Sequence, residues 1–115
     1  MLVSIIIPVF NESNTIFEIL KKIDKVKGFK KEIIIINDGS TDNTKKIIQK
    51  NCFNLYSKFI SYTENRGKGY ACRKGLEKVK GEIVIIQDAD LEYDPNDYSK
   101  LVEPIITKKS KIVYG

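Results

Sequence analysis

Apolar residues recur along this chain in two patterns, short continuous runs and longer segments with helical spacing. Residues 3–7, 32–36 and 82–86 are runs dominated by isoleucine and valine. Runs of this length and composition predict strands that are buried on both faces of a sheet. Residues 58–62 form a weaker run and residues 112–114 begin another, so we expect five strands.

The segments between these runs carry apolar residues at helical spacing. Residues 16–26 define the apolar face of a first helix, which we expect to end at Gly28. A shorter helix is predicted to end near Asn51. A third has its apolar face between Ala71 and Val79, and Gly81 is expected to end it.

Polar residues predict where the elements begin and end. Pro8 is expected to stop the first strand. Thr15, followed three residues later by Glu18, fits a capping box at the start of the first helix. Ser40 or Asp42 is expected to cap the second helix. The further helix is expected to open at Asp94-Pro95 and to be kinked or split at Pro104.

Strands and helices alternate along the whole chain. This order predicts an α/β fold, a Rossmann-like parallel sheet flanked by helices, in one domain that spans residues 1–115. In such a sheet every loop that follows a strand lies at one edge, where open α/β sheets bind ligands. The unusual polar segments all follow strands: 8–12, 37–42, 64–69 and 88–92. This asymmetry predicts a ligand site at that edge.

Composition narrows the classes of function. The 115 residues carry a net charge of +5, but the lysines are spread along the chain, which does not indicate a nucleic-acid partner. The absence of histidine excludes a histidine-based triad or zinc site. Cys52 and Cys72 lie in helical contexts and are predicted to be buried free thiols.

Neither a signal-peptide pattern nor an apolar run of about 20 residues is present in the sequence. We therefore expect a cytoplasmic location. The mild positive charge is compatible with a position at the cytoplasmic face of a membrane.

Three carboxylates, those of Asp88, Asp90 and Glu92, follow the fourth predicted strand. Clustered carboxylates repel one another unless a cation lies between them. Oxygen ligands of this kind suit Mg²⁺, Mn²⁺ or Ca²⁺. The cluster therefore predicts a metal that holds a diphosphate. A solvated acidic loop before a helix is the alternative, and this segment alone does not decide between them.

Two other segments contain candidate binding residues. Asp38 beside Gly39 could accept an N–H bond from a nucleotide base, or could serve ordinary turn and cap chemistry. Residues 66–69 combine two cations, two glycines and free helix N–H groups, which favours anions, without the spacing of a Walker A loop. Phe10 could stack on a base and Glu12 could bind a ribose, or they could be a packing aromatic and a helix-start acid.

These motifs together resemble the nucleotide-binding half of a family 2 glycosyltransferase with the GT-A fold. The motifs are Pro-Val-Phe-Asn-Glu at 8–12, Asn-Asp-Gly-Ser-Thr-Asp at 37–42, Asn-Arg-Gly-Lys-Gly at 65–69 and Asp-Ala-Asp at 88–90. Residues 87–95, 101–105 and 113–115 most resemble the dolichyl- and polyprenyl-phosphate sugar transferases. The resemblance covers essentially the whole chain and implies the N-terminal part of a longer domain.

The resemblance implies roles for individual residues. Ile36 and Asp38 would hold the base, and Asp90, the candidate catalytic residue, would ligate the metal with help from Glu92. The nucleotide-sugar site, with Lys68 added from the anion-favouring segment, would comprise Pro8, Phe10, Glu12, Ile36, Asp38, Lys68, Asp88, Ala89 and Asp90. Two positions depart from the family: Asn37 replaces a common Asp, and Glu92 stands where the polyprenyl-phosphate group often has Gln.

The implied activity is metal-dependent, inverting transfer of a hexose from a UDP- or GDP-hexose, with Mg²⁺ or Mn²⁺ as cofactor and polyprenyl phosphate as acceptor. The alternative is a truncated nucleotide-sugar-binding remnant without transferase activity, and we expect the segment alone to be inactive. A phosphoryl-transfer domain of the receiver or haloacid-dehalogenase type would need an Asp after the first strand, where residues 8–10 are Pro-Val-Phe.

Overall fold

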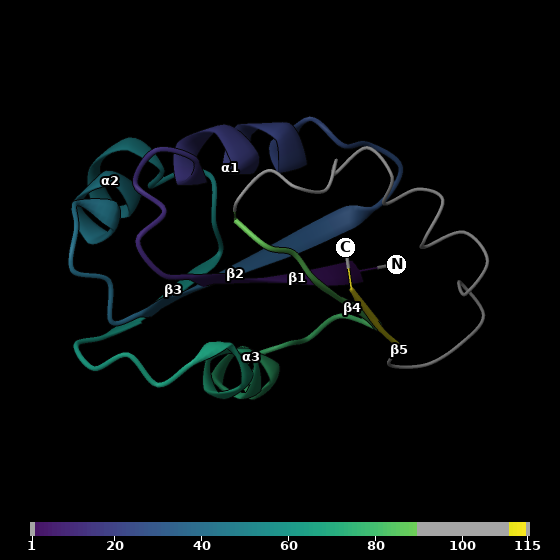
Figure 1. Ribbon diagram of the computed structural model, residues 1–115. Helices are drawn as coiled ribbons and strands as arrows, with labels where there is room; N and C mark the ends of the chain where they lie inside the picture. Colours follow the sequence, from purple (N-terminus) through teal and green to yellow (C-terminus); the bar gives the residue numbers. More distant parts are fainter. Residues whose placement is uncertain (1, 90–110, 115) are drawn as a thin grey trace.

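A computed structural model describes residues 2–89 and 111–114 of the chain. The elements are β1 (Leu2–Val9), α1 (Ile16–Asp24), β2 (Lys30–Asp38), α2 (Thr44–Asn51), β3 (Lys58–Tyr62), α3 (Lys68–Leu76), β4 (Ile83–Ile86) and β5 (Lys111–Tyr114). The strands form one sheet in the order β3-β2-β1-β4-β5, and every neighbouring pair is parallel (Figure 1). The predicted α/β class is confirmed.

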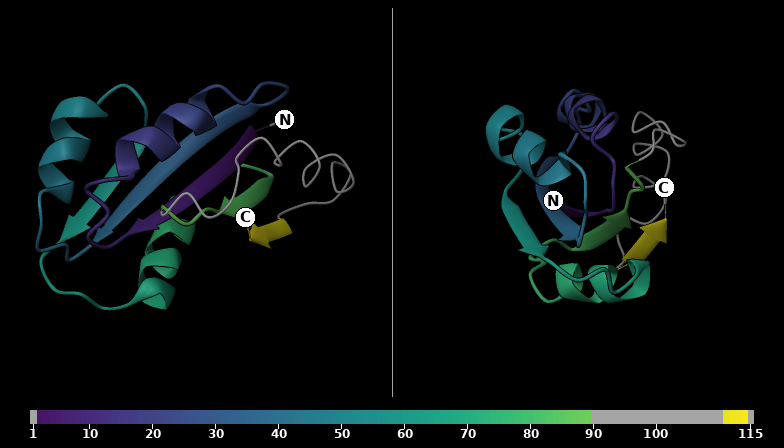
Figure 2. Two further views of the ribbon diagram at one scale, coloured as in Figure 1. Left: turned by 45° about the horizontal axis from the view of Figure 1, so that its top comes forward. Right: turned by 60° about the vertical axis from the view of Figure 1, so that its left-hand side comes forward.

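The sheet lies between two helical layers. Helices α1 and α2 cover one face and α3 covers the other (Figures 1 and 2). Each face therefore has its own core: the larger one lies under α1 and α2, and the smaller one includes Ile6, Ile34, Ile36 and Ala71 beside α3. Strands β1 and β4 are neighbours although three helices and two strands separate them in sequence, so the strand order reverses between them. Such a switch point is where open α/β sheets form ligand crevices.

Strand β1 continues through Pro8 to Val9, so the prediction that Pro8 ends the strand is wrong. Pro8 still pairs with Ile36 of β2, whereas the pairing of β1 with β4 ends at Ile6. The carbonyl of Ile6 accepts a bond from Gln87, so Ile6 faces β4, and Pro8, two residues further, faces the same side. Pro8 has no N–H to donate, but β4 no longer pairs with β1 at this position, so the strand tolerates the proline.

Strand β2 is also longer than expected, because Asn37 and Asp38 belong to it and pair with Ser61 and Tyr62 of β3. The side chain of Asn37 reinforces this pairing by donating to the Ser61 hydroxyl at 3.2 Å. The strand therefore carries Asp38 to its carboxyl end, where the side chain is 3% exposed.

Helices α1 and α3 end earlier than predicted, at Asp24 and Leu76. Lys31 explains the first of these ends. Its ammonium donates to the carbonyls of Ile23, Asp24 and Val26 and satisfies groups that the next helical turn would otherwise bond. The helix can therefore stop before Gly28.

The predicted helix caps are confirmed only in part. Thr15 is the N-cap residue of α1, but its side chain makes no capping bond and no capping box with Glu18 forms. Asn43, and neither Ser40 nor Asp42, is the N-cap residue of α2, also without a side-chain capping bond. The Asp42 carboxylate instead accepts the backbone N–H of Thr44 at 2.9 Å. Asp42 thus bonds locally at the start of α2, whereas the side chains of Thr15 and Ser40 make contacts with distant segments of the chain.

A buried polar cluster lies at the amino ends of the strands, opposite the loops that follow them. The Glu32 carboxylate, 7% exposed, accepts the hydroxyl of Ser4 at 2.6 Å, the N–H of Lys80 at 2.9 Å and the ammonium of Lys58 at 3.1 Å. Burial by itself favours the neutral acid, but these hydrogen bonds outweigh it and hold the pKa of Glu32 below its ordinary value. The cluster fixes the turn between α3 and β4.

The remaining sequence predictions concern the two cysteines, the helix after Asp94 and membrane-spanning segments. Cys52 and Cys72 are buried free thiols, as predicted. The helix expected from Asp94 and the kink at Pro104 lie outside the described residues. Within residues 2–89 and 111–114, no helix is long and apolar enough to cross a membrane.

Candidate functional site

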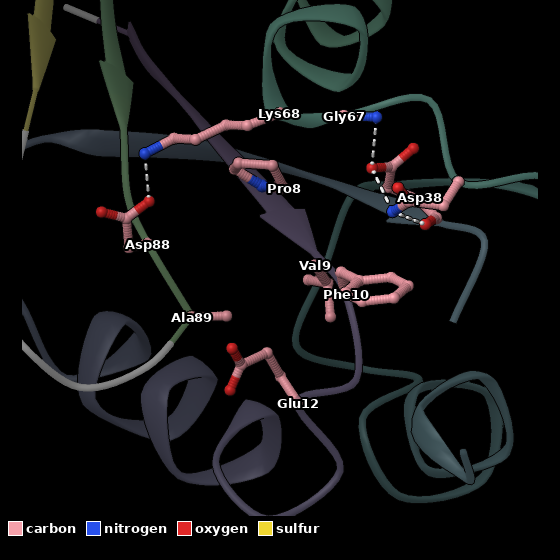
Figure 3. Close-up of a pocket in the computed structure, with 10 residues that line it drawn as sticks. Pro8, Val9, Phe10, Glu12, Asp38, Gly67, Lys68, Asp88 and Ala89 are labelled. Atoms are coloured by element: carbon pink, nitrogen blue, oxygen red, sulfur yellow. Dashed lines mark hydrogen bonds and ion pairs between the residues drawn. The ribbon is translucent and has the colours of Figure 1, made fainter. Parts of the chain in front are cut away.

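A pocket of about 340 Å³ opens at the carboxyl edge of the sheet, close to the switch point between β1 and β4 (Figure 3). The segments that follow β1, β2, β3 and β4 all contribute to it, as the parallel topology requires. The lining residues are Pro8, Val9, Phe10, Glu12, Asp38, Asn65, Gly67, Lys68, Asp88 and Ala89. A pocket of this size lies within the range that binds small organic ligands.

The structure brings together most of the residues predicted from sequence. Those that line the pocket are Pro8, Phe10, Glu12, Asp38, Lys68, Asp88 and Ala89. Ile36 is fully buried in the core beside α3 and its side chain is not among the lining residues. Asp90 and Glu92 lie outside the described residues. Their metal-binding roles, and the base-binding role of Ile36, stay predictions.

Asp38 joins the end of β2 to the loop that follows β3. One carboxylate oxygen accepts the backbone N–H of Arg66 at 2.8 Å. The other accepts the amide of Asn65 and the N–H of Gly67, both at 2.9 Å. The Tyr62 hydroxyl also interacts with this carboxylate. Asp38 thus shapes one wall of the pocket.

Gly39 permits the close approach of these two loops. It has a φ of 66°, and a Cβ atom at this position would lie 2.4 Å from the backbone nitrogen of Asn65. A glycine at such a position could leave room for a ligand to approach. The space is instead occupied by the chain itself, so any larger residue would push the loop after β3 away from Asp38.

Asn11 joins the loop after β1 to the loop after β2. Its φ of 53° is in the left-handed region, where Asn is one of the better tolerated residues. Its side-chain oxygen accepts the backbone N–H groups of Thr41 at 2.8 Å and Asp42 at 3.3 Å. Its own N–H donates to the Ser40 hydroxyl at 3.0 Å. Phe10 and Glu12, on either side of Asn11, are thereby held at the pocket.

Lys68 and Asp88 face each other across the pocket. The ammonium lies 2.5 Å from the carboxylate, and the two side chains are 50% and 29% exposed (Figure 3). Lys68 is the first residue of α3, whose N-terminus also favours negative charge. A phosphate that entered here would meet the cation and the helix end together.

The loop after β3 is further braced by aromatic residues. The Tyr62 and Tyr70 rings pack edge to face with centroids 5.4 Å apart, and the guanidinium of Arg66 lies 5.2 Å from the Tyr70 ring. Burial, together with the charge of Asp38, raises the pKa of the Tyr62 phenol, so this group stays neutral. These contacts supply a rigid backing for the pocket wall.

The chemistry of the lining residues fits a hard cation in part. Glu12 and Asp88 provide carboxylate oxygens, which Mg²⁺ and Mn²⁺ prefer. Among the residues that the structure describes, no group of three or more acidic or cysteine side chains is close enough to hold a metal. The donor set is of the right type, and its predicted completion, Asp90 and Glu92, comes directly after Ala89 in the chain.

Sequence reasoning missed several residues of the site. Asn11 and Asn65 carry most of the loop-to-loop hydrogen bonds, and both belong to motifs that were singled out for other residues. Asn11 could have been suspected because Asn is enriched at positive φ in turns. Asn65 gave no comparable signal, because its partner Asp38 lies 27 residues away in the sequence.

Fold and pocket together define an α/β domain of the GT-A type, with a pocket at the carboxyl edge of its sheet. Residues 4–115 match the family described as glycosyl transferase family 2. The chain belongs to this family.

Two curated relatives illustrate the range of the family. The chain is 33% identical to a dolichol-phosphate mannosyltransferase of Pyrococcus furiosus over 106 residues, which cover 91% of this chain and 30% of that protein. It is 38% identical to a poly-beta-1,6-N-acetyl-D-glucosamine synthase of Staphylococcus aureus over 101 residues, 88% of this chain and 24% of that protein. The chain therefore spans less than a third of the length of either relative.

Two solved structures share the fold. The mannosyltransferase PcManGT of Pyrobaculum calidifontis, in complex with GDP-Man and Mn²⁺, superposes with a TM-score of 0.73 at 31% identity, covering 83% of this chain and 29% of that one. Glucosyl-3-phosphoglycerate synthase of Mycobacterium tuberculosis, in complex with Mn²⁺, UDP and glucosyl-3-phosphoglycerate, gives 0.74 at 28% identity, covering 92% and 40%. Both neighbours confirm the GT-A fold of this chain.

Proposed function

We propose that this chain is the donor-binding part of a metal-dependent, inverting glycosyltransferase that transfers a hexose from UDP- or GDP-hexose to a polyprenyl phosphate. The observation that carries the proposal is the pocket itself. The carboxyl ends of the strands and the loops that follow them place an aromatic side chain, a buried carboxylate, a cation and further acids around one cavity. These groups correspond in kind to the base, ribose and diphosphate of a nucleotide sugar.

In the proposed complex the nucleotide sugar would extend from Asp38, at its base, toward Asp88, at its diphosphate. The Asp38 carboxylate, which lines the pocket, would accept an N–H of the base, and Phe10, 44% exposed, would cover the base. Glu12 would accept the ribose hydroxyls, and Lys68 would pair with the diphosphate. Ala89 is 3% exposed, and its small side chain leaves space beside the acids for the sugar phosphate.

A divalent cation would be held by Asp90 and Glu92, with Asp88 contacting the ribose and diphosphate. When bound, Mg²⁺ or Mn²⁺ would neutralise the leaving diphosphate and act as a Lewis acid. The two structural neighbours described above, each crystallised with Mn²⁺ and a nucleotide, support this assignment.

The acceptor proposal follows from the relative named as a dolichol-phosphate mannosyltransferase. The second ionisation of a phosphomonoester has a pKa of about 6, so its oxygen is a ready nucleophile at neutral pH. That oxygen would form the new bond to the anomeric carbon while the bond to the nucleoside diphosphate breaks. Attack from the face opposite the leaving group inverts the configuration. A sugar hydroxyl as acceptor would need a general base in addition.

The test is a transfer assay on the complete natural protein with UDP- and GDP-hexoses, Mn²⁺, and either a polyprenyl phosphate or an oligosaccharide acceptor. We expect turnover that requires metal and polyprenyl phosphate, with an inverted anomeric product. Turnover with the oligosaccharide alone would contradict the acceptor assignment. Nucleotide-sugar binding by calorimetry without any transfer would instead identify a binding remnant.

A further inference from the structure

The hydroxyl of Thr15 connects two parts of the pocket that come from opposite ends of the described chain. It lies 2.6 Å from the backbone carbonyl of Ala89, 74 residues away, and 2.9 Å from the carboxylate of Glu12. Thr15 is the N-cap residue of α1, but the hydroxyl bonds to no helix N–H. A residue type that usually caps a helix is therefore used here for a tertiary contact.

A threonine hydroxyl has one hydrogen to donate, and both of its neighbours here are acceptors. Thr15 can therefore donate fully to only one of them at a time, or share its hydrogen between the two. The contact to Ala89 is shorter by 0.3 Å, but Glu12 brings a negative charge that attracts the same hydrogen. The two contacts compete for one hydrogen.

The Ala89 carbonyl belongs to the turn that carries Asp88 and leads directly to Asp90. Strand β4 ends at Ile86, and Gln87 makes the last backbone bond to β1. At Asp88 and Ala89 the pairing of β4 with β1 no longer fixes the backbone. The Thr15 hydroxyl therefore supplies an anchor for this turn at the point where the candidate metal ligands begin.

We propose that Thr15 is a positioning residue that couples nucleoside binding at Glu12 to the placement of Asp88 and Ala89. When a hydroxyl of the bound nucleotide sugar donates to Glu12, it satisfies the negative charge that otherwise draws the Thr15 hydrogen away from the Ala89 carbonyl. The hydrogen is then available to Ala89, and the turn that precedes Asp90 is held more firmly. The inference rests on the proposed function, because it concerns the same donor and the same cation.

The experiment measures this coupling directly. UDP and GDP are titrated by calorimetry into the complete natural protein with and without Mn²⁺, and the factor by which Mn²⁺ improves affinity is compared among variants. Thr15→Ser keeps the hydroxyl, whereas Thr15→Val keeps the shape and removes it. We expect Thr15→Ser to stay within about twofold of the wild-type factor and Thr15→Val to lose about three- to tenfold, the effect of one hydrogen bond.

Two further variants separate positioning from packing. Thr15→Ala also lacks the hydroxyl but cannot crowd its neighbours, so it should lose the Mn²⁺ effect as Thr15→Val does. Thr63→Val makes the same substitution on the exposed loop after β3, outside the pocket lining, and should keep the wild-type factor. Thermal unfolding of each variant shows whether it is folded under the conditions of the titration.

The outcomes are distinct. A wild-type Mn²⁺ factor in both Thr15→Val and Thr15→Ala would overturn the inference while leaving the proposed function intact. Equal losses of affinity with and without metal, or a Thr15→Ser variant as impaired as Thr15→Val, would show a purely structural role and also overturn it. A wild-type protein whose nucleotide affinity does not respond to Mn²⁺ would overturn the inference and the metal-dependent function together.

Discussion

The carboxylate of Asp38 accepts the backbone N–H of Gly67 at 2.9 Å, which ties the end of β2 to the first turn of α3 (Figure 3). Together with the bonds from Asn65 and Arg66, this contact makes one buried carboxylate the organiser of a whole loop. Lys68, the next residue, is delivered to the pocket by the same arrangement. The position of the Asp38 carboxylate and the position of the Lys68 ammonium are therefore not independent.

Asp38→Ala should consequently affect both binding and stability. The substitution removes the charged acceptor of three hydrogen bonds from residues 65–67. Each such bond contributes roughly 1.5–3 kcal/mol to stability, but water can replace part of this at the edge of the sheet. We expect the affinity for UDP or GDP to fall more than tenfold and the free energy of unfolding to fall by about 2 kcal/mol, measured by calorimetry and chemical denaturation. Asp24→Ala, at an exposed acid at the end of α1, is the control. Nucleotide affinity that survives in Asp38→Ala would contradict the role of Asp38.

Asn11 allows backbone conformation and hydrogen bonding to be separated. Asn11→Gly keeps the positive φ but loses the acceptor for Thr41 and Asp42, and should weaken nucleotide binding about fivefold at a stability cost of about 1 kcal/mol. Asn11→Ala adds roughly 1–2 kcal/mol of left-handed strain. Asn14→Ala, at an exposed position nearby, should change neither quantity. If Asn11→Gly binds as tightly as wild type, the side chain is not needed to hold Phe10 and Glu12.

Asp90→Ala tests the metal assignment. Because Asp90 is predicted to ligate the cation, the variant should bind donor weakly and without response to Mn²⁺ or Mg²⁺, whereas metal-free affinity should stay close to wild type. The measurement is a metal titration at fixed UDP- or GDP-hexose. A variant whose affinity still rises with metal as in wild type would place the cation on other residues.

The Glu32 cluster predicts an acid-dependent stability that is separate from the pocket. The pKa of the Glu32 carboxyl is lower in the folded protein than its ordinary value of 4.5. The ionised carboxylate therefore stabilises the fold fully above about pH 4.5, and this stabilisation is lost as the pH falls through the folded pKa. Glu32→Gln should lower the free energy of unfolding by about 2 kcal/mol at pH 7 and by less at pH 3. Urea denaturation at both values measures this, and a pH-independent difference would show that the carboxylate charge plays no part.

The sequence by itself determined the fold class and the edge at which the pocket lies. Isoleucine-rich runs such as residues 32–36 can be satisfied only by burial on both faces, and their alternation with helices requires a parallel sheet. Parallel strands send all the loops that follow them to one edge. Pro8, Glu12, Lys68 and Asp88 line the pocket for this reason, since each lies near the end of a strand, follows one or opens a helix at this edge.

The tertiary structure decided what the polar side chains in those loops do. Thr15, Ser40 and Asp42 have the types and spacing of helix caps, yet none provides the predicted cap. Capping competes with partners that only the folded chain supplies, such as the Ala89 carbonyl for Thr15 and the N–H of Asn11 for Ser40. Sequence periodicity records which face of an element is buried. A hydrogen bond between loops depends on which strands become neighbours, and the strand order of the sheet sets this.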